Sequence, residues 1–262
     1  MAAELGETYR VWLGDCIPSW SLLPRNLITT LVETDIGPEQ GLRVGADLPA
    51  GKLEVVPAFR AARDLLLAID RAGLAPPSAA GELDPGFLQV AGQGAPVELM
   101  AYVAAVMGLM HLTHVRTEGI GVTTEGRTLA ASLKSSDAQA GPFFAELVAV
   151  TLRTFNMAYL DELGINGYPQ SHITLVLYLL EQVAREPRPA AELARMASMP
   201  TEVPAEIEGD PITAAFEARA LRYLVWFDVM TQESDGRYRI TDNFDRLFSF
   251  DIPSVAVDGR PN

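Results

Sequence analysis

The order of patterns between residues 171 and 250 constrains the fold more than any other feature of this chain. A strongly apolar segment, SHITLVLYLLEQVAR, is followed by a short helical pattern at Ala190 to Met199 and a long one at Ile212 to Val229. TQESDGRYRIT then has the form of a β-hairpin with Asp235-Gly236 at its tip. With a last helical turn or two at Asp242 to Phe250, this is the element order of a winged helix-turn-helix. We therefore predict a winged-helix unit at residues 171–250.

Residues 57–134 contain part of the same order. Apolar residues recur at helical spacing from Pro57 to Gly73, and a second apolar stripe runs from Pro96 to Met110. The Pro-, Gly- and Ala-rich segment 74–96 between them is predicted to be a linker or an ordered loop. The two helices that should precede a hairpin are thus separated by a long loop.

A hairpin and a capped helix follow this loop and the second stripe. Apolar and polar residues alternate on both sides of Glu118-Gly119, which is typical of a short β-hairpin. Thr123 or Thr124 can cap a helix that starts near Glu125. This tail completes the prediction of a first winged-helix-like unit at residues 57–134.

The remaining segments join and flank these two units. Apolar residues from Phe144 onward keep helical spacing as far as Gly164, which predicts a long connecting helix at 143–163. Residues 1–56 are interrupted by many prolines and glycines, so we expect an irregular N-terminal arm there and a flexible tail at 251–262. The predicted fold class is mainly α, with tandem winged-helix-like units joined by a long central helix.

The charge balance bears on the class of partner. The 262 residues include 20 basic and 34 acidic side chains, which gives a formal net charge of −14. A field of this sign repels polyanions at long range and favours solubility. It argues against a broad nucleic-acid surface, although it leaves room for a local basic patch.

The sequence also bears on the compartment. The single cysteine, Cys16, excludes an internal disulfide framework and a thiolate metal cluster. The first residues carry acidic side chains where a signal peptide needs basic ones. No stretch approaches about 18 uninterrupted apolar residues, the length needed to span a membrane. We expect a cytoplasmic protein with no membrane partner.

Four phrases resemble a known group of proteins. They are RTFNMAYLDEL, ITLVLYLLEQV, FEARALRYLVWFDVM and YRITDNFDRLFSF, and VTTEGRTLA precedes them at Val122 to Ala130. Together they resemble a family of bacterial plasmid- and transposon-associated proteins of unknown function with a C-terminal winged-helix region. The resemblance covers about residues 97–250 and rests on packing and turn signals. It implies a fold but brings no established activity.

One functional hypothesis is a DNA-binding protein or transcriptional regulator. A winged helix places its long helix in the major groove and its wing on the backbone. The second unit offers four arginines for this role: Arg219, Arg222, Arg237 and Arg239. Within residues 212–250, however, the six acidic side chains outnumber the five basic ones. Asp235 also lies at the predicted wing tip, where a phosphate would approach. DNA binding is therefore kept as the alternative.

The leading hypothesis is a non-enzymatic interaction or scaffolding protein. Aromatic residues concentrate near the C-terminus, and such residues are favoured at protein interfaces. The candidates for a partner or dimer interface are Tyr223, Trp226, Tyr238 and Phe248. The alternative for each of them is a place in the core beneath the wing. A protein partner or self-association as a dimer is expected.

No pattern for catalysis, a cofactor or a metal stands out. The phosphate-loop, dinucleotide and nucleophile-elbow patterns are all missing from the sequence. His111 and His114 have helical spacing but lack the three or four convergent ligands that zinc requires. The acidic segment 200–211, predicted to be a loop, lacks the ligand order of a calcium site. We predict no enzyme activity, cofactor or metal, with a dispersed active site as the open alternative.

Overall fold

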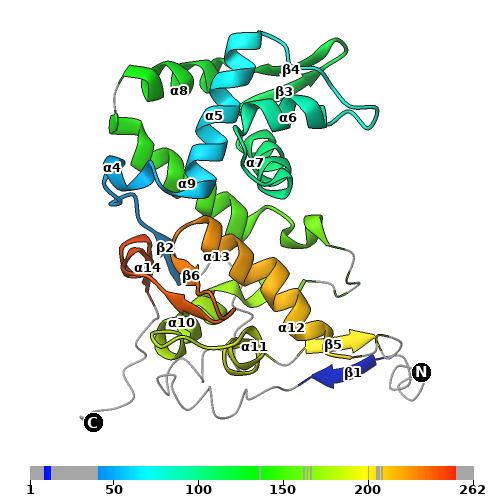
Figure 1. Cartoon of the computed structure of the whole chain (residues 1–262), viewed down its shortest axis with the longest axis vertical. Coiled ribbons are helices and arrows are strands. Elements are labelled where there is room, and N and C mark those ends of the chain that lie inside the picture. Colours follow the sequence, from blue (N-terminus) through cyan, green and yellow to red (C-terminus); the bar gives the residue numbers. More distant parts are fainter. Residues whose placement is uncertain are drawn as a thin grey trace. The chain divides into compact units, whose positions relative to one another are not determined.

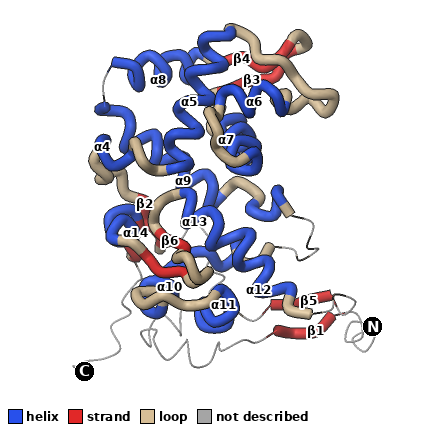
Figure 2. Tube along the Cα trace, viewed as in Figure 1, coloured by secondary structure: helices blue, strands red, loops and turns tan. Residues whose placement is uncertain are grey.

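The computed structural model describes residues 9–12, 41–135, 137–161, 163, 165, 167–199, 201–204, 207 and 209–251. The described chain is mainly helical, as predicted, and its strands form four sheets of two strands each (Figures 1 and 2). It divides into two compact units. Unit 1 comprises residues 1–43, 161–225 and 229–262, and unit 2 comprises residues 44–160 and 226–228.

Unit 2 is built largely from helices around one hairpin. Its elements are α4 (Ala50–Leu53), α5 (Pro57–Ala72), α6 (Pro85–Ala91), α7 (Val97–Leu109), β3 (Thr113–Arg116), β4 (Gly119–Val122), α8 (Thr124–Ser135), the 3-10 turn η1 (Asp137–Gln139), α9 (Ala140–Arg153) and the 3-10 turn η2 (Met157–Leu160).

Helices α5 and α7 lie within two residues of their predicted bounds, but α6 was missed. It lies inside segment 74–96, for which a linker or loop was predicted. The Asp84 side chain accepts a hydrogen bond from the amide of Phe87 over 3.1 Å, and Pro85 occupies the first turn. Both are helix-start signals. Leu88 and Ala91 of this short helix are buried, so packing stabilises it more than its length does.

The hairpin β3–β4 and the capped helix after it are confirmed. Thr113 pairs with Val122 and the two strands are antiparallel. A third segment joins them, because the amides of Ala75 and Ile120 donate to each other's carbonyls over 2.8 and 3.0 Å. The Thr123 hydroxyl caps α8 by accepting from the amide of Gly126 over 3.0 Å.

Helix α9 is shorter than the predicted helix at 143–163. It ends at Arg153, and the chain then turns because Asn156 Oδ1 accepts a hydrogen bond from the amide of Ala158 over 3.1 Å. Such a side-chain bond to nearby backbone competes with helix continuation. The apolar spacing nevertheless continues through η2, whose Met157 is buried.

An aromatic cluster forms part of the core of unit 2. Phe59 contacts Phe144 edge-on, with ring centroids 6.3 Å apart. Residues 226–228 bring two more rings to this unit. Phe227 meets Phe144 at 6.1 Å, and Trp226 stacks on Tyr102 at 5.4 Å. Aromatic pairs in such geometries contribute about 0.5–1.5 kcal/mol each beyond the area that they bury.

Unit 1 combines helices with short strands from distant parts of the chain. Its described elements are β1 (Tyr9–Trp12), the 3-10 turn η3 (Gln170–His172), α10 (Ile173–Val183), α11 (Ala190–Ala197), β5 (Thr201–Pro204), α12 (Pro211–Phe216), the π-helical turn η4 (Glu217–Leu221), α13 (Arg222–Trp226, ending in unit 2), β6 (Met230–Gln232), β7 (Tyr238–Ile240), α14 (Asp242–Leu247) and β8 (Phe248–Phe250).

The predicted helices and the hairpin of residues 171–250 are present. The strands β6 and β7 pair antiparallel, with Gly236 in a left-handed conformation at the turn. Arg188 exchanges two backbone hydrogen bonds with Tyr238, of 2.9 and 2.8 Å. The Thr241 hydroxyl caps α14 by accepting from the amide of Asn243.

Three predictions, for the N-terminal arm, for segment 200–211 and for the last helical segment, were wrong in part. The N-terminal arm is not irregular throughout, since β1 lies in it, as do α4 and the strand β2 (Leu42–Val44). Segment 200–211 is not only a loop, because β5 pairs with β1. The last predicted helical segment ends at Leu247, and β8 pairs with β2. Of the predicted tail, all but Asp251 lies outside the described residues. No helix in the described part is long and apolar enough to cross a membrane.

Replacing Gly126 with alanine tests how closely α8 packs on the hairpin. A Cβ at this position would clash with the carbonyl oxygen of Leu112 and would lie 2.6 Å from a methyl of Val122. Although alanine is the better helix former, we expect Gly126→Ala to lower the free energy of unfolding by about 1–3 kcal/mol. The control is Gly51→Ala in α4, where a Cβ meets nothing within 4 Å. Urea denaturation in which both variants behave alike contradicts this packing.

Candidate functional site

A groove lies on the outer face of α7 in unit 2. It has a volume of about 370 Å³. Its floor consists of Ala101, Ala104, Ala105 and Gly108, which recur at helical spacing along one face of α7. Because these side chains are so small, the helix backbone is open to close approach along this face.

Apolar side chains from neighbouring elements form the walls of the groove. Leu88 belongs to α6, Ile120 belongs to β4 and Val115 belongs to β3. Tyr159 of η2 also lines the groove, and its hydroxyl donates a hydrogen bond to Glu82 over 2.8 Å. This hydrogen bond, together with burial and the charge of Glu82, raises the pKa of Tyr159 above its ordinary value. The hydroxyl therefore stays protonated across the neutral range and acts as a hydrogen-bond donor to Glu82.

The surroundings of the groove are unusually apolar for a solvent-facing surface. Val97 on α7 is 59% exposed, Val115 is 68% exposed and Tyr159 is 44% exposed. All the large hydrophobic side chains found exposed in the described chain belong to unit 2. Glu98 is the one charged residue of α7, and it lies in the first turn, three positions before Ala101 of the groove floor. Exposed apolar surface rimmed by polar groups is typical of protein–protein interaction sites.

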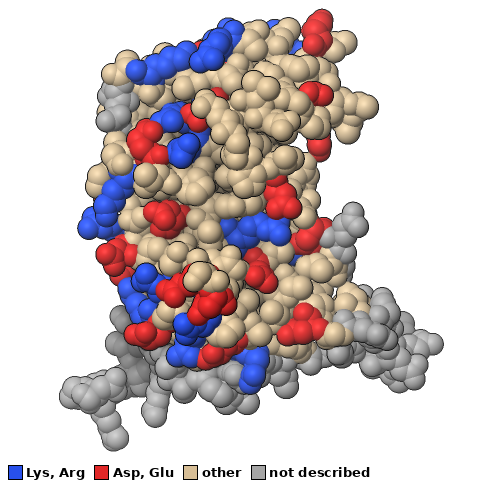
Figure 3. Space-filling model, viewed as in Figure 1, with Lys and Arg blue, Asp and Glu red and all other residues tan. Residues whose placement is uncertain are grey.

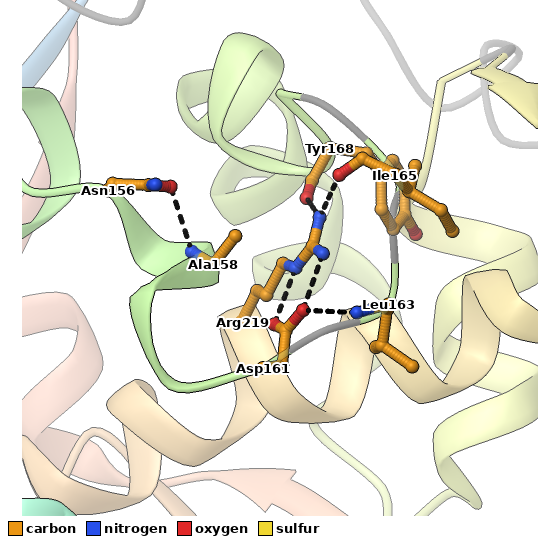
Figure 4. A network of polar contacts seen from close by, with 7 residues as sticks. All are labelled: Asn156, Ala158, Asp161, Leu163, Ile165, Tyr168 and Arg219. Carbon is orange, nitrogen blue, oxygen red and sulfur yellow. Dashed lines mark hydrogen bonds and ion pairs between the residues drawn. The ribbon is translucent and has the colours of Figure 1, made fainter.

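Arg219, the first of the predicted DNA contacts, is buried. Its side chain is only 2% exposed and lies in the π-helical turn η4 (Figure 4). Its Nε and Nη2 donate to the two carboxylate oxygens of Asp161 over 2.7 and 2.6 Å. Its Nη1 donates to the backbone carbonyls of Ile165 and Tyr168. The guanidinium therefore holds the turn that precedes α10, and it is not presented to a ligand.

The charge of Asp161 is stabilised within the same network. Burial raises the pKa of this carboxyl, but hydrogen bonds from Arg219 and from the amide of Leu163 outweigh it, so the pKa lies below its ordinary value. Asp161 is thus ionised at neutral pH in the folded protein. The Arg219 side chain of η4 is thus bonded to three positions of the preceding segment, and Asp161 also accepts a hydrogen bond from the amide of Leu163 (Figure 4).

The other predicted DNA contacts are also engaged with acidic groups. Arg237 Nε lies 2.7 Å from a carboxylate oxygen of Asp235, and Arg239 Nε lies 2.9 Å from one of Glu233. Both arginines are about half exposed, at 47% and 48%. Arg222 is half-buried, and its charge helps to lower the pKa of Asp161. The four arginines do not converge on a face free of carboxylates.

The predicted interface aromatics lie in the protein interior. Tyr223 is fully buried, and Trp226, Tyr238 and Phe248 are at most 9% exposed. The Tyr238 hydroxyl donates to Glu217 over 2.5 Å, and burial together with this hydrogen bond raises its pKa. Phe248 packs edge-on against Phe244, with centroids 5.1 Å apart. These rings stabilise the fold, and the sequence does not distinguish this role from an interface because aromatic residues serve both.

The histidines and the cysteine do not assemble into a metal site in the described residues, where no group of three or more potential ligands is found. His111 is exposed at the end of α7, and His114 accepts a hydrogen bond from Arg116 within β3. Cys16 lies outside the described residues.

Comparisons with protein-family models, with curated proteins and with solved structures find no match to this chain. The family resemblance of residues 97–250 therefore stays a prediction. Any functional conclusion rests on the geometry alone.

The ion pair of Arg219 and Asp161 is expected to be a major contributor to stability. Asp161→Asn leaves a buried guanidinium without its counter-charge, which costs about 3–5 kcal/mol. Because the pKa of Asp161 is lowered by folding, its contribution is present above the unfolded-state pKa of about 3.9 and is lost as the pH falls through the lower folded-state value. Urea denaturation between pH 7 and pH 3 measures both effects.

Asp235→Asn is the matched control for this experiment. It removes an exposed carboxylate that pairs with Arg237, so no measurable change in the unfolding midpoint is expected. Equal destabilisation by Asp161→Asn and Asp235→Asn at pH 7 contradicts the role assigned to the buried pair.

Proposed function

We propose that each unit contains a winged-helix-like fold. The support comes from a shared order of elements in the two units. In unit 2, α5 leads through Ala75, which pairs with Ile120, to α6, α7 and the hairpin β3–β4. In unit 1, α10 leads through Arg188, which pairs with Tyr238, to α11, the helix α12–α13 and the hairpin β6–β7. A threonine-capped helix follows each hairpin.

We further propose that the chain is a non-enzymatic interaction protein that binds a partner protein through the groove on α7. In a winged helix, the helix before the hairpin is the one that enters the DNA major groove. Here the outer face of α7 carries alanine, glycine, valine and leucine, with Glu98 as its one charge. It offers no side-chain donor to phosphates or base edges, whereas it offers an apolar surface to a protein.

The chemistry of the groove favours an amphipathic helix as its occupant. Small residues along α7 permit a second helix to approach closely, and an apolar stripe at positions i, i+3, i+4 and i+7 fills such grooves. Glu82 lines the groove, and Glu98 precedes the groove floor by three positions in the first turn of α7. Basic side chains flanking the apolar stripe of the partner complement these carboxylates.

DNA binding through unit 1 has less support. A phosphate-binding face needs cations without adjacent carboxylates, since neutralised phosphates supply most non-specific affinity. Arg219 is buried against Asp161, and Arg237 and Arg239 pair with carboxylates of their own hairpin. To contact a phosphate, these arginines would have to break their ion pairs, and the free energy lost would offset part of the free energy gained from the phosphate contact.

Selection of peptides from a display library on the full-length protein tests the groove. We expect enriched peptides to carry apolar residues at helical spacing, flanked by lysine or arginine. Ala105→Arg places a long cationic side chain in the floor of the groove, so peptide affinity should fall by at least about tenfold, which is 1.4 kcal/mol.

The matched control is Ala131→Arg, an exposed position of α8 that does not line the groove. It should leave peptide affinity unchanged. The proposal fails if no peptide family is enriched, or if Ala105→Arg and Ala131→Arg bind the selected peptides equally well while both remain folded.

A further inference from the structure

A second, smaller hollow lies beside the hairpin β3–β4 in unit 2. It has a volume of about 100 Å³ and is lined by residues from the end of α5, from the hairpin and from α8. Successive side chains of a strand point to opposite faces. Val115 lines the groove on α7 and Arg116 lines the small hollow, while His114 lines both. The hollow therefore lies mainly on the other face of the hairpin from the groove, and the two share His114 as a lining residue.

Positive and hydrogen-bonding groups from two elements converge on this hollow. Arg116 and His114 come from β3, and Arg127 comes from the first turn of α8. Both arginines are exposed at the surface and His114 is half-buried. Arg116 donates a hydrogen bond to the His114 ring, which orients the two side chains relative to each other. Two guanidinium groups from separate elements are suited to an oxyanion that presents several oxygens.

The one carboxylate that lines the hollow already has a counter-charge. Asp70 of α5 accepts a hydrogen bond from Lys134 of α8 over 2.9 Å. Its negative charge therefore offsets little of the field of Arg116 and Arg127. Figure 3 shows basic side chains gathered along α8 and the adjoining end of α5. This is a local positive surface on a chain whose net charge is −14.

The hollow is large enough for a small ligand, and the absence of a side chain at Gly121 lets the His114 ring and Leu74 lie close to the backbone. Gly121 forms part of the lining, and a Cβ there would lie 3.3 Å from both the His114 ring and a methyl of Leu74. Because a water molecule takes up about 30 Å³ in the liquid, a hollow of about 100 Å³ has space for roughly three waters or for one small oxyanion.

We propose that this hollow is a binding site for a phosphate group, held by Arg116 and Arg127 with His114 as an additional hydrogen-bonding group. A phosphate presents at least three acceptor oxygens and up to two negative charges, which match two guanidinium groups better than a carboxylate does. The site does not depend on a protein in the groove of α7, so either proposal can fail alone.

Titration of the full-length protein with inorganic phosphate tests the site directly. At low ionic strength, phosphate should shift the imidazole NMR signals of His114 and should bind more tightly than acetate. We expect Arg116→Gln or Arg127→Gln to weaken phosphate binding by roughly tenfold or more, since each removes a charge-assisted hydrogen bond. Arg60→Gln, an exposed position of α5 that does not line the hollow, should leave binding unchanged.

Two further ligands identify the source of the phosphate. A phosphoserine peptide that binds like inorganic phosphate, while its unphosphorylated form does not, supports a phosphorylated protein segment. Binding of inorganic phosphate and not of the peptide supports a free phosphate.

The proposal is overturned if phosphate leaves the His114 signals unmoved, or if Arg60→Gln weakens binding as much as Arg116→Gln. It is also overturned if duplex DNA binds far more tightly than phosphate and the Arg60, Arg116 and Arg127 variants all weaken DNA binding equally.

Discussion

The groove on α7 and the small hollow beside the hairpin both depend on the backbone pairing that fixes the hairpin β3–β4. Ala75 and Ile120 exchange two hydrogen bonds, and Gly119 lets the strands approach closely, because a Cβ there would lie 2.6 Å from the carbonyl oxygen of Ala75. Gly119 also has a φ of 154°, which side-chain-bearing residues rarely adopt. The cap from Thr123 then directs α8 along the hairpin. One face of the hairpin thus borders the apolar groove, and the other borders the basic hollow.

The distribution of charge in unit 1 argues against DNA binding through its last hairpin. In unit 1, three of the arginines considered for DNA binding pair with acidic side chains: Arg219 in the interior, and Arg237 and Arg239 at the surface. A buried guanidinium requires such a partner, because its desolvation is not otherwise offset. The acidic excess of the chain supplies these partners. The basic side chains of α8 in unit 2 were not among the candidates that the sequence suggested for binding.

Local patterns predicted much of the fold, and long-range contacts account for what they missed. Helical spacing located α5, α7 and α10, and turn residues located both hairpins. The strand β1 was missed because it pairs with β5, almost 200 positions away, and no local pattern encodes that pairing. The groove was missed because alanines on α7 define a surface only once Leu88 and Tyr159 stand beside them. The burial of Arg219 was also missed, because it depends on the ion pair with Asp161, a residue distant in the sequence.

The most direct measurement of the central claim, that α7 of unit 2 is the partner-binding face, is photo-crosslinking in the producing cell. A photoreactive residue is placed at Val97 or Leu109 on α7, or at Arg237 or Arg239 on the last hairpin, all of them at the surface. Covalent adducts of one defined protein from the α7 positions, and none from the hairpin positions, are the predicted result. Adducts to DNA or to protein from the hairpin positions alone would contradict the account.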